Sequence, residues 1–431
     1  MNSFLMKYMQ LAPLGLAYQA EKQVRMSIAL HPDEIDAWAA LTGSLYSQGR
    51  FAEAVEAGKL YEKLGGAQPE WMLIMAKSYA ELGEFAAADN YFLRAESLMP
   101  ETRSVQWECA MQHLVMGRHL EGWAGYQSRL QVHSLSFLHI YPFEFDAWDG
   151  MFNKGGALLL HGEQGLGDEV MFARWVPEVL AQAKNHRTKV FLAVTPPLLA
   201  LFENSFPEAV CLPHSRGDAD VLAWENGFKP AWLKDLPKNT RHCPTGSLPF
   251  LLRGSQIDSK PYLKPLSKDV AYFKKLLVEQ KPRVGKKKKV GLAWCANLRT
   301  NFGRDKSIDL ALFEAFSQQP KLCLVGVQGP EYGQQAQQCP NVQMIDWHQH
   351  LDGLDRVAGL MANLDTVVTV DTSYAHLAGA MGLPTHVLLK KNHDWRFSVD
   401  ESKALYANLQ RHVQSVRGDW PTLISTIGTE I

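Results

Sequence analysis

The chain has 431 residues, which is too long for one ordinary hydrophobic core and predicts at least two compact units. Its composition, 46% hydrophobic and 21% charged residues, is that of a globular protein, and a formal net charge of −1 excludes a global attraction to nucleic acid or acidic membranes. The cysteines are scattered without a CxxC pair, which argues against a zinc site or a disulfide framework. No secretory leader pattern and no run of about 18 apolar residues occurs, so we expect a soluble, cytoplasmic protein without a transmembrane segment.

Residues 1–131 carry an internal repeat. Glycines recur at positions 15, 49, 83 and 117, and their constant spacing of 34 residues is the period of helix-turn-helix repeats. Gly83 stands where one helix must stop and turn, because glycine adopts the left-handed conformation without a Cβ penalty. The best-formed unit resembles the TPR pattern through Ala76, Tyr79, Gly83, Ala88, Phe92, Ala95 and Pro100. This resemblance implies a groove that binds a peptide or protein; the alternative is a repeat that caps its neighbour or mediates self-association.

Residues 132–156 are rich in aromatic side chains that lack helical spacing. A floppy linker would be polar instead, so we interpret this stretch as an ordered connector packed between the domains. The aromatic residues are Phe137, Tyr141, Phe143, Phe145, Trp148 and Phe152.

From residue 157 onward, short apolar runs alternate with longer amphipathic segments. The pattern predicts strands at 157–162 and 189–194 and helices at about 168–183 and 198–206, then strands at 289–295, 321–328, 342–347, 366–371 and 385–390. Two such blocks predict two Rossmann-like lobes, 157–275 and 286–431, with the boundary near 265–285. The fold class is therefore α + α/β. Lys286–Lys289 could touch phosphate, but we favour a solvated strand entry.

The first strand leads into a glycine loop and then a helix. Gly165 and Gly167 belong to a GxxGxG spacing, which differs from the dinucleotide fingerprint, so we do not expect NAD. Asp168, in the first turn of the helix at the strand's carboxyl end, is a candidate base for an acceptor hydroxyl; the alternative is a helix cap. Glu163 is the alternative base, and Glu169 is expected to point along the helix. Glu163 and Gln164 are also candidate sugar or base contacts.

The strand at 366–371 is followed by a helix of small residues. Asp371 ends the strand, Thr372 and Ser373 begin the turn, and the backbone amides at the helix start could hold a diphosphate. His376, one turn into the helix, could add a hydrogen bond to phosphate or ribose. The alternative is a core histidine whose ring nitrogens are already satisfied.

Two further polar segments could contact the same ligand. Asn297, Arg304 and Lys306 lie in a basic loop after the strand at 289–295 and can reach diphosphate oxygens, unless the loop is merely solvated. Later, the segment HDWRF contains three candidate sugar or base contacts, for which core packing of the tryptophan is the alternative. These are Asp394, Trp395 and Arg396.

Together, GEQGLGDE, AWCAN, RDKSIDL, VDTSYAHLAGAMGLPTHVLL and HDWRF resemble TPR-containing proteins related to glycosyltransferase family 9, the heptosyltransferase-like group, over about residues 155–420. The resemblance implies a GT-B fold whose C-terminal lobe holds the nucleotide sugar and whose N-terminal lobe faces the acceptor. It implies that Asp168 is the base and Lys306 the phosphate-contacting lysine. It also implies that the terminal helix, in GDWPTLISTIGTEI, crosses back to brace the first lobe. Ser373 departs from the glycine common in heptosyltransferases and narrows the approach to phosphate.

The implied function is transfer of a sugar from a nucleotide-sugar donor to an acceptor hydroxyl, by an inverting mechanism. The sequence lacks a DxD motif at the position that metal-dependent enzymes use, so we expect no metal and no cofactor besides the co-substrate. The repeat-bearing relatives favour a protein acceptor docked on the TPR, such as a surface or flagellar-type protein. The alternatives are a lipopolysaccharide-type glycolipid acceptor, a non-catalytic TPR scaffold with a nucleotide-sugar-binding domain, and a UDP-sugar epimerase.

Overall fold

The computed structural model describes residues 3–132, 135, 138–139, 141–253, 260–401 and 404–431. Contacts divide the chain into two units. One contains residues 1–133 together with 391–403, and the other contains residues 134–390 together with 404–431. We call them the helical unit and the two-lobed unit. None of the described helices combines the length and the apolar character needed to cross a bilayer.

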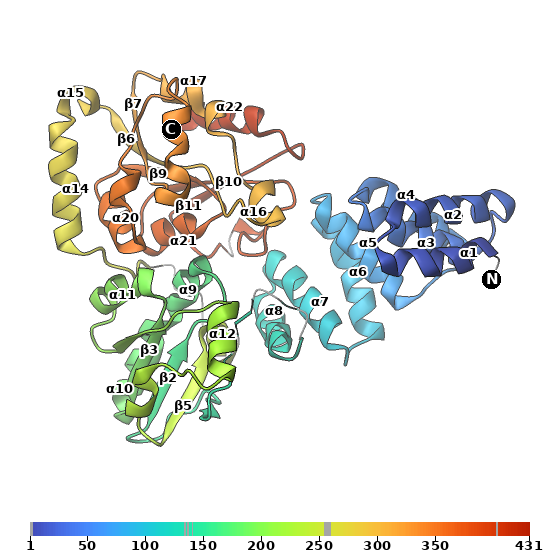
Figure 1. The fold of residues 1–431 in the computed structure, drawn as a ribbon, viewed down its shortest axis with the longest axis horizontal. Coiled ribbons are helices and arrows are strands. Elements are labelled where there is room, and N and C mark those ends of the chain that lie inside the picture. The colour runs from blue at the N-terminus through green and yellow to red at the C-terminus, as the bar shows by residue number, and fades with distance from the viewer. Residues whose placement is uncertain (1–2, 133–134, 136–137, 140, 254–259, 402–403) are drawn as a thin grey trace. The chain divides into compact units, whose positions relative to one another are not determined.

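The helical unit is a stack of antiparallel helix pairs, coloured blue to cyan in Figure 1. The predicted turn glycines, Gly15, Gly49, Gly83 and Gly117, all have positive φ, at 73°, 73°, 73° and 75°. The 34-residue period therefore marks the turn of each pair, and the predicted TPR-like repeat is confirmed. Its helices are α1 (Ser3–Leu11), α2 (Ala17–Leu30), α3 (Ile35–Ser47), α4 (Phe51–Lys63), α5 (Pro69–Glu81), α6 (Phe85–Leu98), α7 (Arg103–Val115) and α8 (His119–Tyr126).

Small residues permit the close packing of these helices. Ala76, Ala88 and Ala95, which match the TPR pattern, are fully buried. Gly58 of α4 lies so close to α5 that an added Cβ would sit 2.1 Å from the Sδ of Met75. The repeat thus alternates small contact points with large core side chains, as the pattern predicts.

The segment 391–403 belongs to the helical unit, although we expected it in the second lobe. The backbone N–H of Val399 donates to the carbonyl of Val115 over 2.8 Å, and the Ser398 hydroxyl donates to the same carbonyl over 3.0 Å. The ring of Trp395 packs edge-on against Trp123 of α8, with centroids 5.5 Å apart. Aromatic packing and backbone hydrogen bonds to α7 and α8 therefore hold this segment.

The first lobe of the two-lobed unit contains a parallel five-stranded sheet with the order β1-β5-β2-β3-β4 (Figure 1). β1 lies in the predicted connector, where Tyr141 and Trp148 are buried, so this described part is ordered; Phe137 lies outside the described residues. The elements are β1 (Asp146–Ala147), β2 (Ala157–His161), β3 (Lys189–Val194), β4 (Val210–Pro213), β5 (Thr240–Pro244), α9 (Leu166–Phe172), α10 (Val176–His186), α11 (Leu199–Ser205), α12 (Asp218–Glu225) and α13 (Leu248–Leu251).

The second lobe contains a parallel six-stranded sheet with the order β11-β10-β9-β6-β7-β8. All five strands predicted here are present, and β11 adds a strand without a sequence prediction. The strands are β6 (Lys288–Ala293), β7 (Leu322–Gly326), β8 (Met344–Ile345), β9 (Thr366–Val370), β10 (Thr385–Leu389) and β11 (Leu409–Val413). The helices are α14 (Ser267–Glu279), α15 (Lys281–Val284), α16 (Asn301–Asp305), α17 (Glu314–Ser317), α18 (Pro330–Gly333), α19 (Gln335–Gln338), α20 (Leu354–Met361), α21 (Ser373–Ala380) and α22 (Trp420–Glu430).

The lobe boundary lies earlier than the predicted 265–285. Helix α14 packs against α20 of the second lobe, where Arg356 and Asp269 form an ion pair of 2.5 Å. The extended stretch before α14 follows the end of α21, because the N–H groups of Tyr262 and Leu263 both donate to the Ala380 carbonyl, over 2.9 and 3.1 Å. The change of lobe therefore falls within this extended stretch.

The resemblance implied that the terminal helix braces the first lobe, but α22 packs against the second lobe instead. Its apolar face enters the core of the second lobe through Trp420, Ile424 and Ile427. The side-chain amide of Gln319 also donates to the Gly428 carbonyl over 2.9 Å. The amphipathic pattern predicted the helix correctly, but the apolar face is buried against its own lobe. The overall fold class, a TPR-like helical repeat and two Rossmann-like lobes as in GT-B, is confirmed by both sheets and the helix pairs.

Candidate functional site

The glycine loop of the first lobe meets the start of α21 in the second lobe. A Cβ added to Gly167 would lie 3.2 Å from Cδ2 of His376 and 3.3 Å from Cα of Ser373. Only a residue without a side chain permits this approach at its present distance. Two predicted segments about 200 residues apart in sequence are thereby brought together, at the carboxyl ends of β2 and β9.

Asp168 lies next to this contact, half-buried in the first turn of α9. Its carboxylate is close enough to the Tyr406 hydroxyl to affect it: burial raises the pKa of Tyr406, and the negative charge of Asp168 raises this pKa further. Gly165, the N-cap of α9, has an extended conformation and lies 3.6 Å, measured from an added Cβ, from an Asp168 oxygen. The structure therefore places the candidate base at the junction of the lobes.

Several polar groups gather at the start of α21. Thr372 is the N-cap, and its hydroxyl oxygen accepts from the N–H of Tyr374 over 3.3 Å. Ser373 is half-buried beside it. Asp371, at the end of β9, forms an ion pair of 3.0 Å with Lys306 from the loop after β6. The carboxyl ends of β6 and β9 thus contribute one cation and one helix N-terminus to the same place.

Lys390 is a second cation at this edge, and the sequence reasoning did not single it out. It directly follows β10, and its side chain is 10% exposed. The ammonium group forms an ion pair of 2.7 Å with Asp305 and lies 5.0 Å from the ring of Phe302. The ammonium group of Lys306 lies 4.4 Å from the same ring. Lys306 and Lys390 therefore approach one exposed aromatic ring.

The other polar residues of the loop after β6 mainly organise that loop. Arg304 donates to the carbonyl of Leu298 over 2.7 Å and also to the side chain of Asn301. The side-chain oxygen of Asn297 accepts from the N–H of Arg299 over 3.0 Å. Both Asn297 and Arg304 are exposed, so they remain within reach of a ligand while shaping the loop.

His376 is buried and takes part in a network between the lobes. Its Nδ1 lies 3.1 Å from the Tyr406 hydroxyl, which lies 3.4 Å from the hydroxyl of Tyr262. Tyr262 donates to the Val170 carbonyl over 2.9 Å, and the Arg174 guanidinium stacks over Tyr406 at 4.4 Å. This arrangement has the features of the core alternative, and the predicted phosphate or ribose contact stays a prediction.

The remaining acidic residues of the glycine-loop motif are buried. Glu163 and Gln164 lie together in the loop, with the Gln164 amide 3.5 Å from a Glu163 oxygen. Glu169 does not point along the helix as expected. It accepts from the hydroxyl of Thr195 over 2.6 Å and forms a buried ion pair with Arg216. The sequence offered no signal for this pair, because its partners lie on separate elements.

The side chain of Arg216 accounts for the glycine at position 162 in the same loop. A Cβ added to Gly162 would lie 1.6 Å from Nη1 of Arg216, so the guanidinium occupies the space of that missing side chain. Nε and Nη1 of Arg216 have no hydrogen-bond partner among the described residues. Arg216 therefore holds the loop by packing and by its ion pair with Glu169.

A group of histidines fills the first lobe behind this loop. His161 and His242 face each other with ring nitrogens 3.1 Å apart. His214 is packed between aromatic rings, including Tyr141 at 4.5 Å and Trp232 at 5.7 Å, and neither of its ring nitrogens has a partner among the described residues. Burial lowers the pKa of His214 to about 4, and the Arg216 charge contributes.

The candidate contacts in HDWRF, Asp394, Trp395 and Arg396, belong to the helical unit, and their role in binding a sugar or base stays a prediction. Trp395 packs against the helical unit, as the alternative interpretation had it, and Arg396 pairs with Asp394 over 2.6 Å within the same segment. The Arg396 guanidinium also stacks on Trp395 at 4.4 Å. Among the residues that the structure describes, no group of three or more histidine, cysteine or acidic side chains could hold a metal ion.

Comparison with known proteins gives a curated relative and several structural likenesses. No protein-family model matches the chain. It is 28% identical over 365 residues to the protein FlbA of Caulobacter vibrioides, which covers 81% of this chain and 59% of FlbA, so the match spans less than two thirds of that protein.

Three solved structures are also similar. ADP-heptose LPS heptosyltransferase II of E. coli has 12% identity and a TM-score of 0.43, covering 64% of this chain and 99% of its own. A glycosyl transferase of family 9 from Veillonella parvula has 14% identity and a TM-score of 0.45, covering 62% and 88%. The TPR protein YrrB has 12% identity and a TM-score of 0.28, covering 30% and 67%.

Proposed function

We propose that the two-lobed unit is a glycosyltransferase that transfers a sugar from a nucleotide sugar to an acceptor hydroxyl. The observation that carries this proposal is the close approach of Gly167 in the first lobe to Ser373 and His376 in the second. Helix α9, which carries Asp168 in its first turn, thereby packs against α21 near its N-terminus. In open parallel sheets, ligands bind at such carboxyl edges.

The proposed reaction is an inverting displacement. Asp168 accepts the proton of the acceptor hydroxyl, and the hydroxyl oxygen forms a bond to the anomeric carbon of the donor sugar. The bond from that carbon to the diphosphate oxygen breaks, and its electron pair leaves with the nucleoside diphosphate. A single displacement from the opposite side inverts the configuration at the anomeric carbon.

The second lobe supplies positive charge for the departing diphosphate. Lys306 and Lys390 approach the site from the ends of β6 and β10, and α21 contributes its N-terminal amides. Preorganised cations at developing negative charge stabilise a transition state without rearranging. We propose that these groups take the place of a metal ion, so transfer should continue in the presence of EDTA. An enzyme inactivated by EDTA and restored by a divalent cation would contradict this point.

Two measurements test the proposal. Binding of the correct nucleotide should raise the melting temperature, because a ligand specific for the native state stabilises it by RT ln(1 + [L]/Kd). UDP, GDP, ADP, CMP and their sugars form the screen, and substitution of Thr372 should remove the shift. Asp168→Asn should reduce turnover by a factor of about 100 or more while the nucleotide shift persists. A normal turnover of this variant would remove Asp168 from its role.

We propose a protein as the acceptor, bound by the helical unit. A hollow of about 340 Å³ lies between α3 and α4 of this unit and is lined by Trp38, Leu41 and Leu60, with Arg25 at its edge. An apolar hollow of this kind suits side chains of a peptide. Leu60→Glu, which places a charge on the apolar lining of the hollow, should impair transfer to a protein acceptor and leave donor binding unchanged. Transfer to a glycolipid with equal efficiency in such variants would favour a lipopolysaccharide-type acceptor, and nucleotide binding without any transfer would favour a scaffold.

A further inference from the structure

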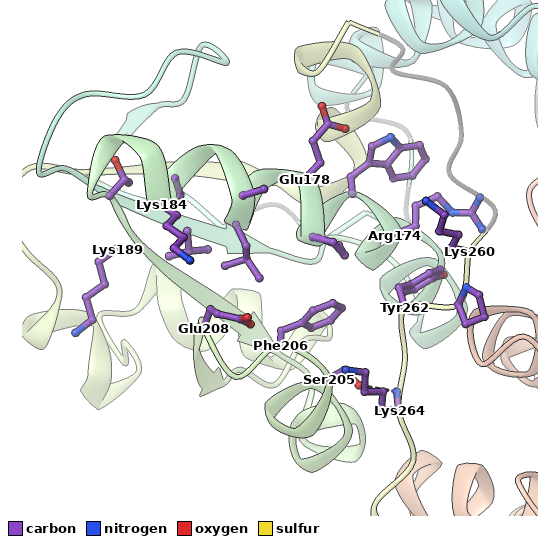
Figure 2. Close-up of a pocket in the computed structure, with 18 residues that line it drawn as sticks. Arg174, Glu178, Lys184, Lys189, Ser205, Phe206, Glu208, Lys260, Tyr262 and Lys264 are labelled. Atoms are coloured by element: carbon purple, nitrogen blue, oxygen red, sulfur yellow. Dashed lines mark hydrogen bonds between the residues drawn. The ribbon is translucent and has the colours of Figure 1, made fainter.

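A second groove lies in the first lobe, away from the glycine loop. It has a volume of about 1150 Å³ and runs between α10, the end of α11 and the extended stretch that precedes α14. Figure 2 shows Phe206 and Glu208 across the groove from α10, with Lys184 toward one end and Arg174 beside Lys260 at the other. No residue of the proposed donor site lines it.

The charge of the groove is predominantly positive. Lys184, Lys189, Lys260 and Lys264 line it, against Glu178 and Glu208. All four lysines are exposed, and Lys184 and Lys264, which lie on different segments of the lining, carry the test described below. An excess of cations around a hollow favours an anionic occupant and increases its association rate.

Arg174 adds a fixed charge at one end. The residue is 6% exposed and is held by two backbone carbonyls: Nη1 donates to Leu405 over 2.5 Å and Nε donates to Met171 over 3.2 Å. Its Nη2 has no hydrogen-bond partner among the described residues. That nitrogen is fully buried, and the guanidinium lies over the rings of Tyr262 and Tyr406, at 5.7 and 4.4 Å. Arg174 therefore contributes a permanent positive charge to this end of the groove.

The walls between these charges are apolar. Leu180 of α10, Val190 of β3 and Phe206 contribute them. An inorganic anion would use the cations only, whereas a polypeptide with alternating acidic and apolar side chains would use both. From Arg174 to Lys184 the chain advances ten residues, roughly 15 Å at the helical rise, which is the length of about five extended residues.

We infer that this groove binds an extended acidic segment of the acceptor polypeptide. Carboxylates of the segment lie near the exposed lysines, in the field of the buried Arg174 guanidinium, and apolar side chains lie against Phe206 and Leu180. The inference rests on the proposed function, because it identifies the occupant as part of a protein acceptor. It names an acidic peptide as the class of ligand and the first lobe as its docking surface.

A binding measurement on the full chain tests this inference without a donor nucleotide. The probe is a fluorescein-labelled decapeptide of alternating glutamate and leucine, followed by fluorescence anisotropy. Lys184→Glu combined with Lys264→Glu should weaken its binding about tenfold or more, because two attractive charges become repulsive. The matched control is Lys274→Glu with Lys275→Glu, which makes the same change in net charge on exposed positions of α14. The control should bind the peptide as the natural chain does.

Three results would overturn the inference: equal loss of binding in the two double variants, equal binding by a peptide with lysine in place of glutamate, or stronger binding of the groove to vesicles with anionic lipids than to the peptide. A tenfold loss confined to the groove variant supports it. The nucleotide melting shift is measured on the same samples, so a missing nucleotide shift with intact peptide binding contradicts only the proposed enzyme activity.

Discussion

His214 provides a quantitative test of the first lobe. It is 2% exposed, its ring lies among Tyr141, Trp224 and Trp232, and neither ring nitrogen has a partner among the described residues. Burial, with the charge of Arg216, lowers its pKa from 6.5 to about 4. The unfolded chain therefore binds a proton at this position at pH values where the folded chain does not.

The sign of the pH effect follows from this difference. Because the pKa is lower in the folded state, the stability is fully present above pH 6.5 and is lost progressively as the pH falls toward 4. Each pH unit within that window costs about 1.4 kcal/mol, so this one residue removes about 2 kcal/mol on acidification from pH 6.5 to pH 5. Such a loss is a considerable part of the 5–15 kcal/mol, roughly, that stabilises an ordinary domain.

His214→Phe isolates this contribution. The substitution keeps a ring among the aromatic neighbours and removes both unpartnered nitrogens, so we expect a more stable protein at neutral pH, by about 1–2 kcal/mol. The difference in unfolding free energy between variant and natural chain should then widen by about 2 kcal/mol at pH 5. Urea unfolding at the two pH values measures this difference. His186→Phe, at an exposed position of α10, is the control. A constant difference at both pH values would refute the reasoning.

Three further predictions follow from contacts in the two-lobed unit. Lys390→Met should reduce kcat/KM for transfer about tenfold or more, because one cation near the departing diphosphate is lost. Gly162→Ala should lower the unfolding free energy by about 1–3 kcal/mol, measured by urea unfolding, since its Cβ would meet the Arg216 guanidinium. Tyr406→Phe should lower the melting temperature by about 2–4 °C through loss of the hydroxyl contact to His376.

Matched substitutions control these experiments. Lys287→Met removes an exposed lysine and should leave transfer unchanged. Gly43→Ala, within α3, places its Cβ 3.7 Å from the nearest side-chain atoms, an ordinary contact, so it should retain stability where Gly162→Ala loses it. Tyr18→Phe changes a hydroxyl on a residue that is 73% exposed and should not alter the melting temperature. Equal effects of a control and its test variant would show that the contact in question is not responsible.

Regular patterns predicted most of the fold. The glycine period located the turns of the helical unit, because a positive φ is a local requirement that only glycine meets easily. Apolar runs located the buried strands, because a parallel strand that is covered on both faces needs apolar side chains at successive positions. The predicted helix at 168–183 is in fact divided between α9 and α10 around a short 3-10 turn at Ala173–Trp175, where Pro177 follows in the first turn of α10.

Side-chain contacts between segments that are distant in sequence could not be predicted from the local sequence pattern. Glu169 is paired with Arg216 from the loop after β4, and Lys390 lies over Phe302, far from it in sequence. Both contacts exist because parallel strands bring their carboxyl ends to one edge, which the sequence suggests only in general terms. Asp168 and Thr372 could be singled out because each lies at the start of a helix that follows a recognisable strand, and Lys306 because it belongs to the basic loop after β6. Three roles remain predictions: Asp168 as the base, Thr372 as part of a diphosphate-binding helix start, and Lys306 as the cation that contacts phosphate.

The membership of residues 391–403 in the helical unit affects how that unit is made. Val115 and Trp123 contact a segment that lies more than 270 positions later in the chain. Synthesis proceeds at roughly 5–20 residues per second. Helices α7 and α8 are therefore made roughly 15–60 seconds before segment 391–403, which packs against them. Removing everything after residue 133 would not yield the natural repeat, because Trp123 would lose the Trp395 ring packed against it. The helical unit is thus completed only after residues 134–390 of the two-lobed unit have been synthesised.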